Sequence, residues 1–229
     1  MKLNILRHES VFCAESFGNK RIDVIGVGAT GSYVTMQLAK LGISNIHVWD
    51  YDKVEDYNLP NQLFGMDHID KLKVEALKDI IKATTGTEIT VHNEKVDGTQ
   101  ELGEVVFLLT DTMDSRKQIF DKGLQYKLRT KLVIETRMDA DNGRVYVINP
   151  CSRTHVEEWK KTLYTDQEAT VSLCGTTVTV GPTAEYLAGL AVWQLIRWFN
   201  IESEPESKDE LENEIIFSIR PTIVMSRKF

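Results

Sequence analysis

Residues 21–50 read RIDVIGVGATGSYVTMQLAKLGISNIHVWD, and the fold prediction depends on this stretch. A compact β-type run over 21–25 breaks into the glycine-rich turn 26–31, and apolar side chains then recur at helical spacing over 32–41. A second β-type run over 45–49 ends at an acid. A strand, a glycine turn, a helix and a strand that ends at an acid follow in the order of a nucleotide-binding βαβ unit.

The alternation of strand and helix patterns continues along the chain. Helices are predicted over 73–83, 114–124, 156–163 and 183–199, and strands over 88–92, 105–109, 132–134, 144–148, 215–217 and 223–225. We therefore predict an α/β fold with a Rossmann-like, mostly parallel sheet flanked by helices and extended by an antiparallel C-terminal strand region. Residues 1–229 are interpreted as a single domain with a crossover loop over 150–180 and an acidic surface loop over 200–214.

Composition and charge limit the classes of function. The chain has 27 Lys and Arg against 34 Asp and Glu, and a net charge of -7 argues against nucleic acid as the main partner. The longest apolar stretch, 188–199, is too short to span a membrane. Three separated cysteines and the lack of an apolar signal segment favour a cytoplasmic protein, and the absence of a CxxC pair argues against structural zinc.

The glycine turn has the chemistry of a phosphate site. Gly26 permits a tight turn, Gly28 lets the backbone approach a phosphate, and Gly31 lets the helix pack closely on the strand. The N-terminus of the following helix offers N–H groups to an anion, and Asp50 stands at the spacing of a ribose-binding acid. The alternative is a turn that is glycine-rich for steric reasons alone.

Residues 50–64, DYDKVEDYNLPNQLF, follow the second strand and are dense in carboxylate and amide groups. Such a segment at the carboxyl end of a strand suits a polar ligand. A plain surface turn is the alternative, because Asp and Asn favour turns.

Several segments together resemble the ThiF/MoeB/HesA family. Residues 50–62 and 71–76 are similar to its D-x-D-x-V-x-x-x-N-L-x-R-Q and K-V-E-A segments, 109–116 to its C-T-D-N-x-x-x-R segment, and 137–147 to its next strand pair. Gly181-Pro182 opens a long helix, as the family's G-P element does. These relatives of the ubiquitin-activating enzymes adenylate a C-terminal carboxylate with Mg-ATP, so the resemblance implies ATP and Mg²⁺ as cofactors.

The resemblance also implies roles for individual residues. It places the ATP site on the glycine turn together with Asp50, Asp52, Asn58, Asn61, Gln62 and Lys73. Asp50 would bind the ribose, Asn58 and Lys73 the triphosphate, and Asp111 would bind Mg²⁺. Lys73 could instead be a plain surface lysine of its helix, and Asp111 a helix-capping residue.

Two positions bear on catalysis. Where the family has an arginine before the glutamine, this chain has Asn61, and asparagine cannot replace a charged bidentate donor. A second family arginine, which comes from the N-terminal segment of the partner subunit in a dimer, is matched by Arg7. The family's zinc cysteines are missing, so no zinc is expected.

Cys174 is the candidate nucleophile, because some family members form an acyl–sulfur intermediate on a cysteine of the crossover loop. No flanking Lys, Arg or His is evident that would lower its pKa, and a small buried hydrophobic residue is the alternative. Cys13 and Cys151 are interpreted as incidental.

The leading hypothesis is an ATP-dependent adenylyltransferase that acts as a homodimer on a small ubiquitin-like or sulfur-carrier protein or on a peptide. The second is a non-catalytic ATP-binding scaffold of the same family, which lost turnover with the arginine at Asn61. The third is an NAD-dependent dehydrogenase, in which the Asn58–Gln62 and Lys73 cluster would have no function.

Overall fold

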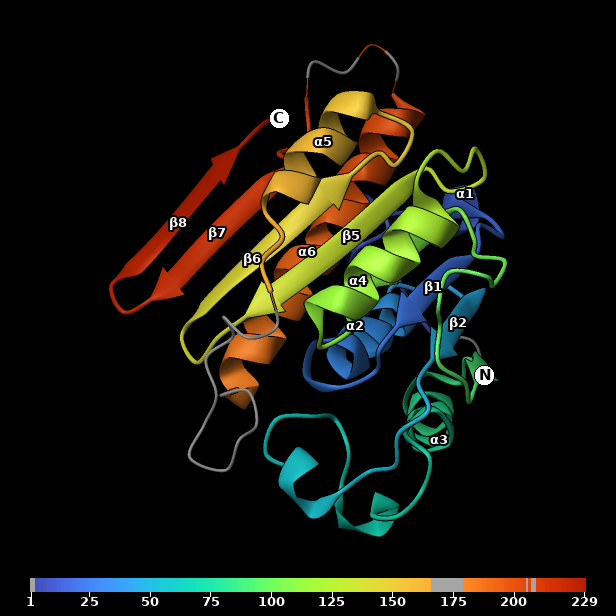
Figure 1. The fold of residues 1–229 in the computed structure, drawn as a ribbon. Coiled ribbons are helices and arrows are strands. Elements are labelled where there is room, and N and C mark those ends of the chain that lie inside the picture. The colour runs from blue at the N-terminus through green and yellow to red at the C-terminus, as the bar shows by residue number, and fades with distance from the viewer. Residues whose placement is uncertain (1–2, 166–178, 205, 207–208) are drawn as a thin grey trace.

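The computed structural model of the chain describes residues 3–165, 179–204, 206 and 209–229. Within these residues an eight-stranded sheet has the strand order β3-β2-β1-β4-β5-β6-β7-β8, with helices on both faces (Figure 1). The predicted α/β class is confirmed.

Parallel strands form one part of the sheet and antiparallel strands the other. The parallel strands are β1 (Ile22–Ile25), β2 (Ile46–Trp49), β3 (Thr90–His92), β4 (Val105–Leu108) and β5 (Leu132–Met138). The antiparallel strands are β6 (Asn142–Ile148), β7 (Glu214–Ile219) and β8 (Thr222–Arg227). The antiparallel C-terminal extension is therefore also confirmed, and β8 lies at the outer edge of the sheet (Figure 1).

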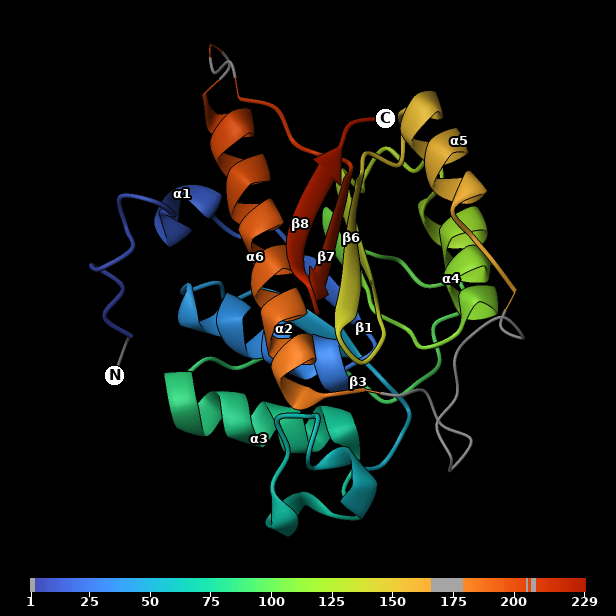
Figure 2. The same cartoon turned by 90° about the vertical axis from the view of Figure 1, so that its left-hand side faces the viewer.

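The helices form two layers, one on each face of the sheet (Figure 2). One layer contains α1 (Ala14–Phe17), α2 (Ala29–Lys40), α3 (Lys73–Thr85) and α6 (Gly181–Ser203). The other contains α4 (Met113–Ile119), the π-helical turn η3 (Phe120–Leu124) that continues it, and α5 (Arg153–Lys161). Two short 3₁₀ turns, η1 (Asp56–Asn58) and η2 (Met66–His68), precede α3.

Strand β4 shows why the central strands are apolar without alternation. Val105 and Phe107 pack into the core beneath α2, α3 and α6, whereas Val106 and Leu108 pack into the core beneath α4 and α5. All four side chains are fully buried. A parallel strand covered on both faces needs apolar residues at every position, as the sequence pattern predicted.

The glycine turn joins β1 to α2 through two close backbone contacts. Gly26 has φ +89°, and a Cβ atom there would lie 2.7 Å from the carbonyl oxygen of Leu109. A Cβ atom at Gly31 would overlap the carbonyl oxygen of Gly26. The steric roles predicted for these two glycines are therefore confirmed, and they bring the N-terminus of α2 against the end of β1.

The strand order places a crevice beside the glycine turn. Strand β1 pairs with β2 on one side and with β4 on the other, and all three are parallel. The chain thus runs from β1 to β2 and β3 on one side of β1, and then crosses to β4 on the other side. Ligands of open α/β sheets bind at such a switch point, outside the carboxyl ends of the strands.

A buried carboxylate ties β5, where the parallel part of the sheet meets the antiparallel part, to the helices that cover it. Glu135 of β5 is fully buried and accepts hydrogen bonds from Arg116 of α4, from Arg137 Nε at 3.0 Å, and from Trp159 Nε1 of α5 at 3.1 Å. A buried charge is tolerated when it is paired and hydrogen-bonded, and the loss of one partner costs about 3–5 kcal/mol. Glu135 therefore fixes both arginines and the position of α5.

The structure differs from the sequence prediction near the acidic segment. The helix predicted to end at 199 continues to Ser203, and Glu214 belongs to β7 with 1% exposure rather than to a surface loop. Ion pairs hold acidic residues of this segment against the rest of the domain, as Arg197 of α6 does with Glu212. The run of acidic residues alone indicated solvent exposure. The arginines that pair with these acids are distant in sequence, so the run does not reveal them.

The described helices give no candidate for a bilayer span, since none combines sufficient length with sufficient hydropathy.

The two glycines of the turn give a matched test of the packing. Gly31→Ala should lower the free energy of unfolding by about 1–3 kcal/mol, because the methyl group overlaps the Gly26 carbonyl and pushes α2 from β1. Gly28→Ala is the control, because its Cβ would meet only Gln62 Nε2, at 3.8 Å. Urea denaturation of both variants measures the difference, and equal stabilities would contradict the close contact.

Candidate active site

A cavity of about 490 Å³ lies at the carboxyl ends of β1, β2 and β4. It is lined by residues of the glycine turn, by the segment after β2, by the start of α3 and by the segment between β4 and α4. Predicted site residues that line it are Gly26, Gly28, Asp50, Asp52, Asn58, Gln62, Lys73 and Asp111. The topology thus gathers residues from four segments into one cavity.

The N-terminus of α2 opens into this cavity. Gly28 is the N-cap residue, no side chain caps the helix there, and Ala29 and Thr30 of the first turn also line the cavity. The space in front of Gly28 contains no backbone atom that a Cβ would contact. Backbone N–H groups and the helix dipole can therefore face an anion directly, as phosphate sites require.

Asp50 lies beside the turn with both carboxylate oxygens held by backbone amides. Its Oδ2 accepts a hydrogen bond from Val27 N and its Oδ1 from Asp52 N, each at 2.9 Å. Burial raises the pKa of Asp50 above its ordinary value, and the charge of Lys73 opposes that shift. The orientation of the carboxylate is fixed, and its remaining acceptor positions suit hydroxyl donors such as those of a ribose.

Lys73 is buried, with 7% exposure, at the first position of α3. Its Nζ donates to Asp52 Oδ2 at 2.9 Å, while its backbone N–H donates to the Asp52 carbonyl oxygen, also at 2.9 Å. Lys73 is therefore no plain surface lysine, because its ammonium group faces the cavity and is countered by a carboxylate that is half exposed.

Two amide side chains, those of Asn58 and Gln62, also line the cavity. Asn58 is buried and its Oδ1 accepts a hydrogen bond from Glu55 N at 3.0 Å, which orients the amide. Gln62 Oε1 is buried, and no hydrogen-bond partner for it exists in the described part of the chain. A buried polar atom without a partner is costly, so this atom marks a place where a ligand would be favourable.

Asp111 is exposed and lines the cavity just after β4. It is not the cap of the next helix: Thr112 is the N-cap residue of α4, and its hydroxyl accepts from Ser115 N at 3.3 Å. Burial raises the pKa of Tyr51, and the carboxylates of Asp52, Asp111 and Asp50 raise it further. Asp111 thus adds to a concentration of negative charge on this side of the cavity.

Gly31 packs against Gly26 and does not line the cavity. Two further predicted residues, Asn61 and Arg7, do not line it either. Asn61 Nδ2 donates to Thr179 Oγ1 at 2.8 Å, and Arg7 is exposed in the N-terminal segment. Cys174 lies outside the described residues. Roles for Asn61, Arg7 and Cys174 stay predictions, as does the contribution of Arg7 to a partner subunit.

Sequence reasoning did not assign several other residues that line the cavity. They include Thr30, Trp49, Tyr51, Tyr57, Glu94, Lys95, Thr110, Thr112, Ser115, Arg116, Thr136, Met138 and Thr179. Glu94 and Lys95 follow β3, so the rule that carboxyl ends of parallel strands meet at one edge could have found them. Arg116 is part of the 109–116 segment and bonds Thr110 O within it, but its pairing with Glu135, 19 residues further on, could not be predicted from the sequence.

The charged side chains of the cavity are mostly acidic. Its carboxylates are Asp50, Asp52, Glu94 and Asp111, and its cations are Lys73, Lys95 and Arg116. Arg116 is itself paired with Glu135, and Lys73 with Asp52. A polyphosphate would therefore need an accompanying cation here, and Mg²⁺ prefers such a set of carboxylate and phosphate oxygens. Among the described residues no three His, Cys, Asp or Glu side chains form a metal site of their own.

Curated relatives of the chain include activating enzymes of ubiquitin-like modifiers. Over 80 residues it is 36% identical to ubiquitin-like modifier-activating enzyme 5 of Caenorhabditis briggsae, covering 34% of this chain and 18% of that enzyme. Over 106 residues it is 33% identical to the NEDD8-activating enzyme E1 catalytic subunit of Arabidopsis thaliana, covering 43% and 23%. The matched segment is thus about a fifth of the length of each relative.

Solved structures with a similar fold cover almost the whole chain. MccB of E. coli, crystallised with ATP, has a TM-score of 0.69 at 17% identity over 94% of this chain and 65% of that chain. PaaA has a TM-score of 0.70 at 19% identity over 94% and 74%. At these identities the likeness establishes the fold. The ThiF family model matches residues 6–223, so the chain belongs to the ThiF family.

Proposed function

We propose that the chain is an ATP-dependent adenylyltransferase that activates the terminal carboxylate of a small ubiquitin-like or sulfur-carrier protein or of a peptide. The observation that carries this proposal is the convergence of Gly28, Asp50, Asn58, Lys73 and Asp111 on one cavity. Family membership and the activating enzymes among its relatives support the reaction class.

Different residues would bind different parts of ATP. The N-terminus of α2 at Gly28 receives phosphate oxygens, and Asp50 accepts hydrogen bonds from the ribose. Lys73 and Asn58 contact the triphosphate, where a fixed cation stabilises the charge that develops on the leaving pyrophosphate. Lys73 can contact the triphosphate because it lines the cavity even while it pairs with the half-exposed Asp52.

The acidic side of the cavity supports a requirement for a divalent cation. Asp111 would bind Mg²⁺, which would neutralise phosphate charge next to the carboxylates. Asp111 suits this role because its side chain is exposed to the cavity and Thr112 performs the capping of α4.

In the proposed reaction a carboxylate oxygen of the acceptor attacks the α-phosphorus of ATP. One bond from carboxylate oxygen to phosphorus forms, and the bond from the α-phosphorus to the pyrophosphate oxygen breaks. The chain supplies position and charge to this step and forms no covalent bond in it.

A non-catalytic ATP-binding scaffold is the second candidate, and Asn61 favours it. The amide of Asn61 is engaged with Thr179 Oγ1, and the cavity lacks the arginine that the family motif places there. This candidate shares ATP binding with the first and differs in having no turnover. An NAD-dependent dehydrogenase has no comparable support, since the family match covers nearly the whole chain.

Pyrophosphate exchange tests the leading proposal. With Mg²⁺ and ATP, labelled pyrophosphate should enter ATP when an acceptor with a free terminal carboxylate is present. Asp111→Asn should reduce the exchange rate by about 10²-fold, the usual effect of removing one electrostatic group from a reacting centre. Asp114→Asn is the matched control, because Asp114 does not line the cavity. Equal exchange with acceptors whose carboxylate is amidated would contradict the proposal.

Asn61→Arg separates the two candidates. If the chain turns over, we expect exchange in the wild type and an increase of about tenfold in the variant, since a charge-assisted hydrogen bond to phosphate contributes about 1.5–3 kcal/mol. Thr179→Val controls for the loss of the Asn61 hydrogen bond alone. Exchange that is absent from the wild type and present in Asn61→Arg would favour the scaffold instead.

A further inference from the structure

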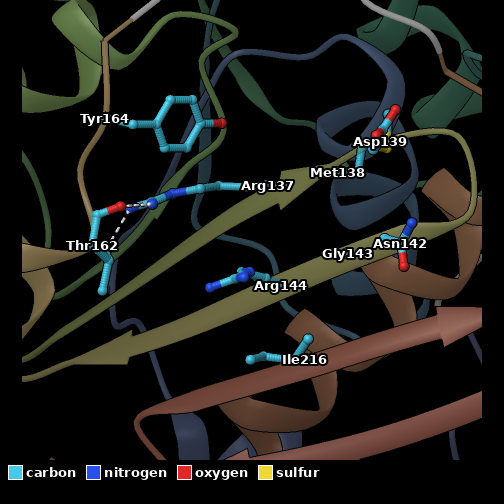
Figure 3. Close-up of a pocket in the computed structure, with 9 residues that line it drawn as sticks. All are labelled: Arg137, Met138, Asp139, Asn142, Gly143, Arg144, Thr162, Tyr164 and Ile216. Atoms are coloured by element: carbon cyan, nitrogen blue, oxygen red, sulfur yellow. Dashed lines mark hydrogen bonds between the residues drawn. The ribbon is translucent and has the colours of Figure 1, made fainter. Parts of the chain in front are cut away.

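A second cavity of about 480 Å³ adjoins the first on the sheet face that carries α5. Its lining residues come from β5, β6, β7 and the segment after α5, and Figure 3 shows them. Met138 lines both cavities. A chain whose terminal carboxylate reaches the first cavity past Met138 would therefore place residues nearer its N-terminus in the second.

Two arginines dominate the second cavity. Arg137 is buried, donates to the Thr162 carbonyl oxygen, and its guanidinium lies 4.4 Å from the ring centroid of Tyr146. Burial alone would lower the pKa of Arg137, but the charge of Glu135 raises it, so the guanidinium stays protonated. Arg144 is less buried than Arg137, because half of its side chain is exposed. In Figure 3 both guanidinium groups lie toward the same end of the cavity.

The buried carboxylates next to these arginines are already balanced by other cations. Glu135 pairs with Arg116 as well as with Arg137, and Glu214 pairs with Arg227 as well as with Arg144. Two carboxylates thus face four arginines, which leaves two positive charges in excess. Burial would raise the pKa of Glu214, yet hydrogen bonds and the charges of Arg227 and Arg144 hold it below its ordinary value.

Within the part of the chain that the structure describes, one acid lies in the cavity lining, at a distance from this excess charge. Asp139 binds the backbone N–H of Ala140 through Oδ1 at 2.7 Å, and Figure 3 shows it at the opposite end of the cavity from the Arg144 guanidinium. The other lining residues are uncharged: Met138, Asn142, Gly143, Thr162, Tyr164 and Ile216. The arginine end of the cavity is therefore complementary to an anionic group with an aliphatic stem.

We propose that the second cavity binds an acidic side chain, aspartate or glutamate, of the acceptor's C-terminal tail. Arg144 pairs with that carboxylate, while Arg137, fixed by Glu135 and Thr162, contributes charge from the cavity wall. The inference rests on the proposed adenylation of a terminal carboxylate and narrows its substrate class to tails that carry an acid upstream of the terminus. Glu214 stays paired with Arg227 when Arg144 turns to the ligand.

Binding of short peptides tests the proposal independently of turnover. The probes are fluorescein-labelled peptides of alanine and serine with a free C-terminal carboxylate, and each upstream position in turn carries Glu, Gln or Lys. Fluorescence anisotropy with the full-length protein should give a Kd about tenfold lower for Glu than for Gln at one position, the effect of one charge-assisted hydrogen bond.

Variants of one arginine then locate the preference. Arg144→Gln should abolish the difference between Glu and Gln peptides, and Arg144→Glu should transfer the preference to the Lys peptide at the same position. Arg220→Gln is the matched control, because Arg220 is 79% exposed, pairs with Asp141 and does not line the cavity.

Three results would overturn the proposal: no binding of any acidic peptide, equal binding of the Glu and Gln peptides, or a preference that survives in Arg144→Gln. A preference that behaves as expected in a protein without pyrophosphate exchange would instead leave the acidic-tail site standing and reject the proposed adenylation. The two failures are therefore distinguishable.

Discussion

The buried carboxylate of Glu135 is the interaction on which both cavities depend. It lies in β5 and binds Arg116, which lines the first cavity, and Arg137, which lines the second. Trp159 of α5 donates to the same carboxylate, so the helix that covers this part of the sheet is positioned by it as well. An unpaired charge at this depth would be strongly destabilising, which keeps all three partners in place. The positions of Arg116, Arg137 and α5 are thus a consequence of satisfying one buried acid.

Most of the fold could be predicted because local patterns and the tertiary structure agree. The apolar run at 105–109 and the turn from Gly26 to Gly31 show this agreement. Burial of the strand on both faces and close backbone contact at the turn leave few alternative structures for these sequences. The acidic segment was predicted less well. Glu214 is buried because Arg144 and Arg227 reach it from neighbouring strands, and no local pattern reveals such partners. Similarly, α6 continues beyond residue 199 to Ser203, although this last part of the helix lies in a polar stretch of sequence.

The candidate site likewise contains residues that the sequence predicted and residues that it did not. Asp50, Asn58, Lys73 and Asp111 come together because the carboxyl ends of parallel strands share one edge, and that rule is readable in sequence. Asn61 belongs to the same motif, yet its amide donates to Thr179, which precedes α6. No role could be assigned to Arg137 and Arg144 in advance, because antiparallel strands and a buried acid place them beside the first cavity. Long-range pairing, rather than motif spacing, decides where they lie.

We expect the cavity at the switch point of the sheet to bind ATP. Isothermal titration calorimetry of the wild-type protein with ATP and, separately, with NAD, each with Mg²⁺, measures this binding. The expected result is saturable binding of ATP at one site per chain, binding that weakens when Mg²⁺ is removed, and no saturable heat with NAD. Saturable binding of NAD with none of ATP would contradict it.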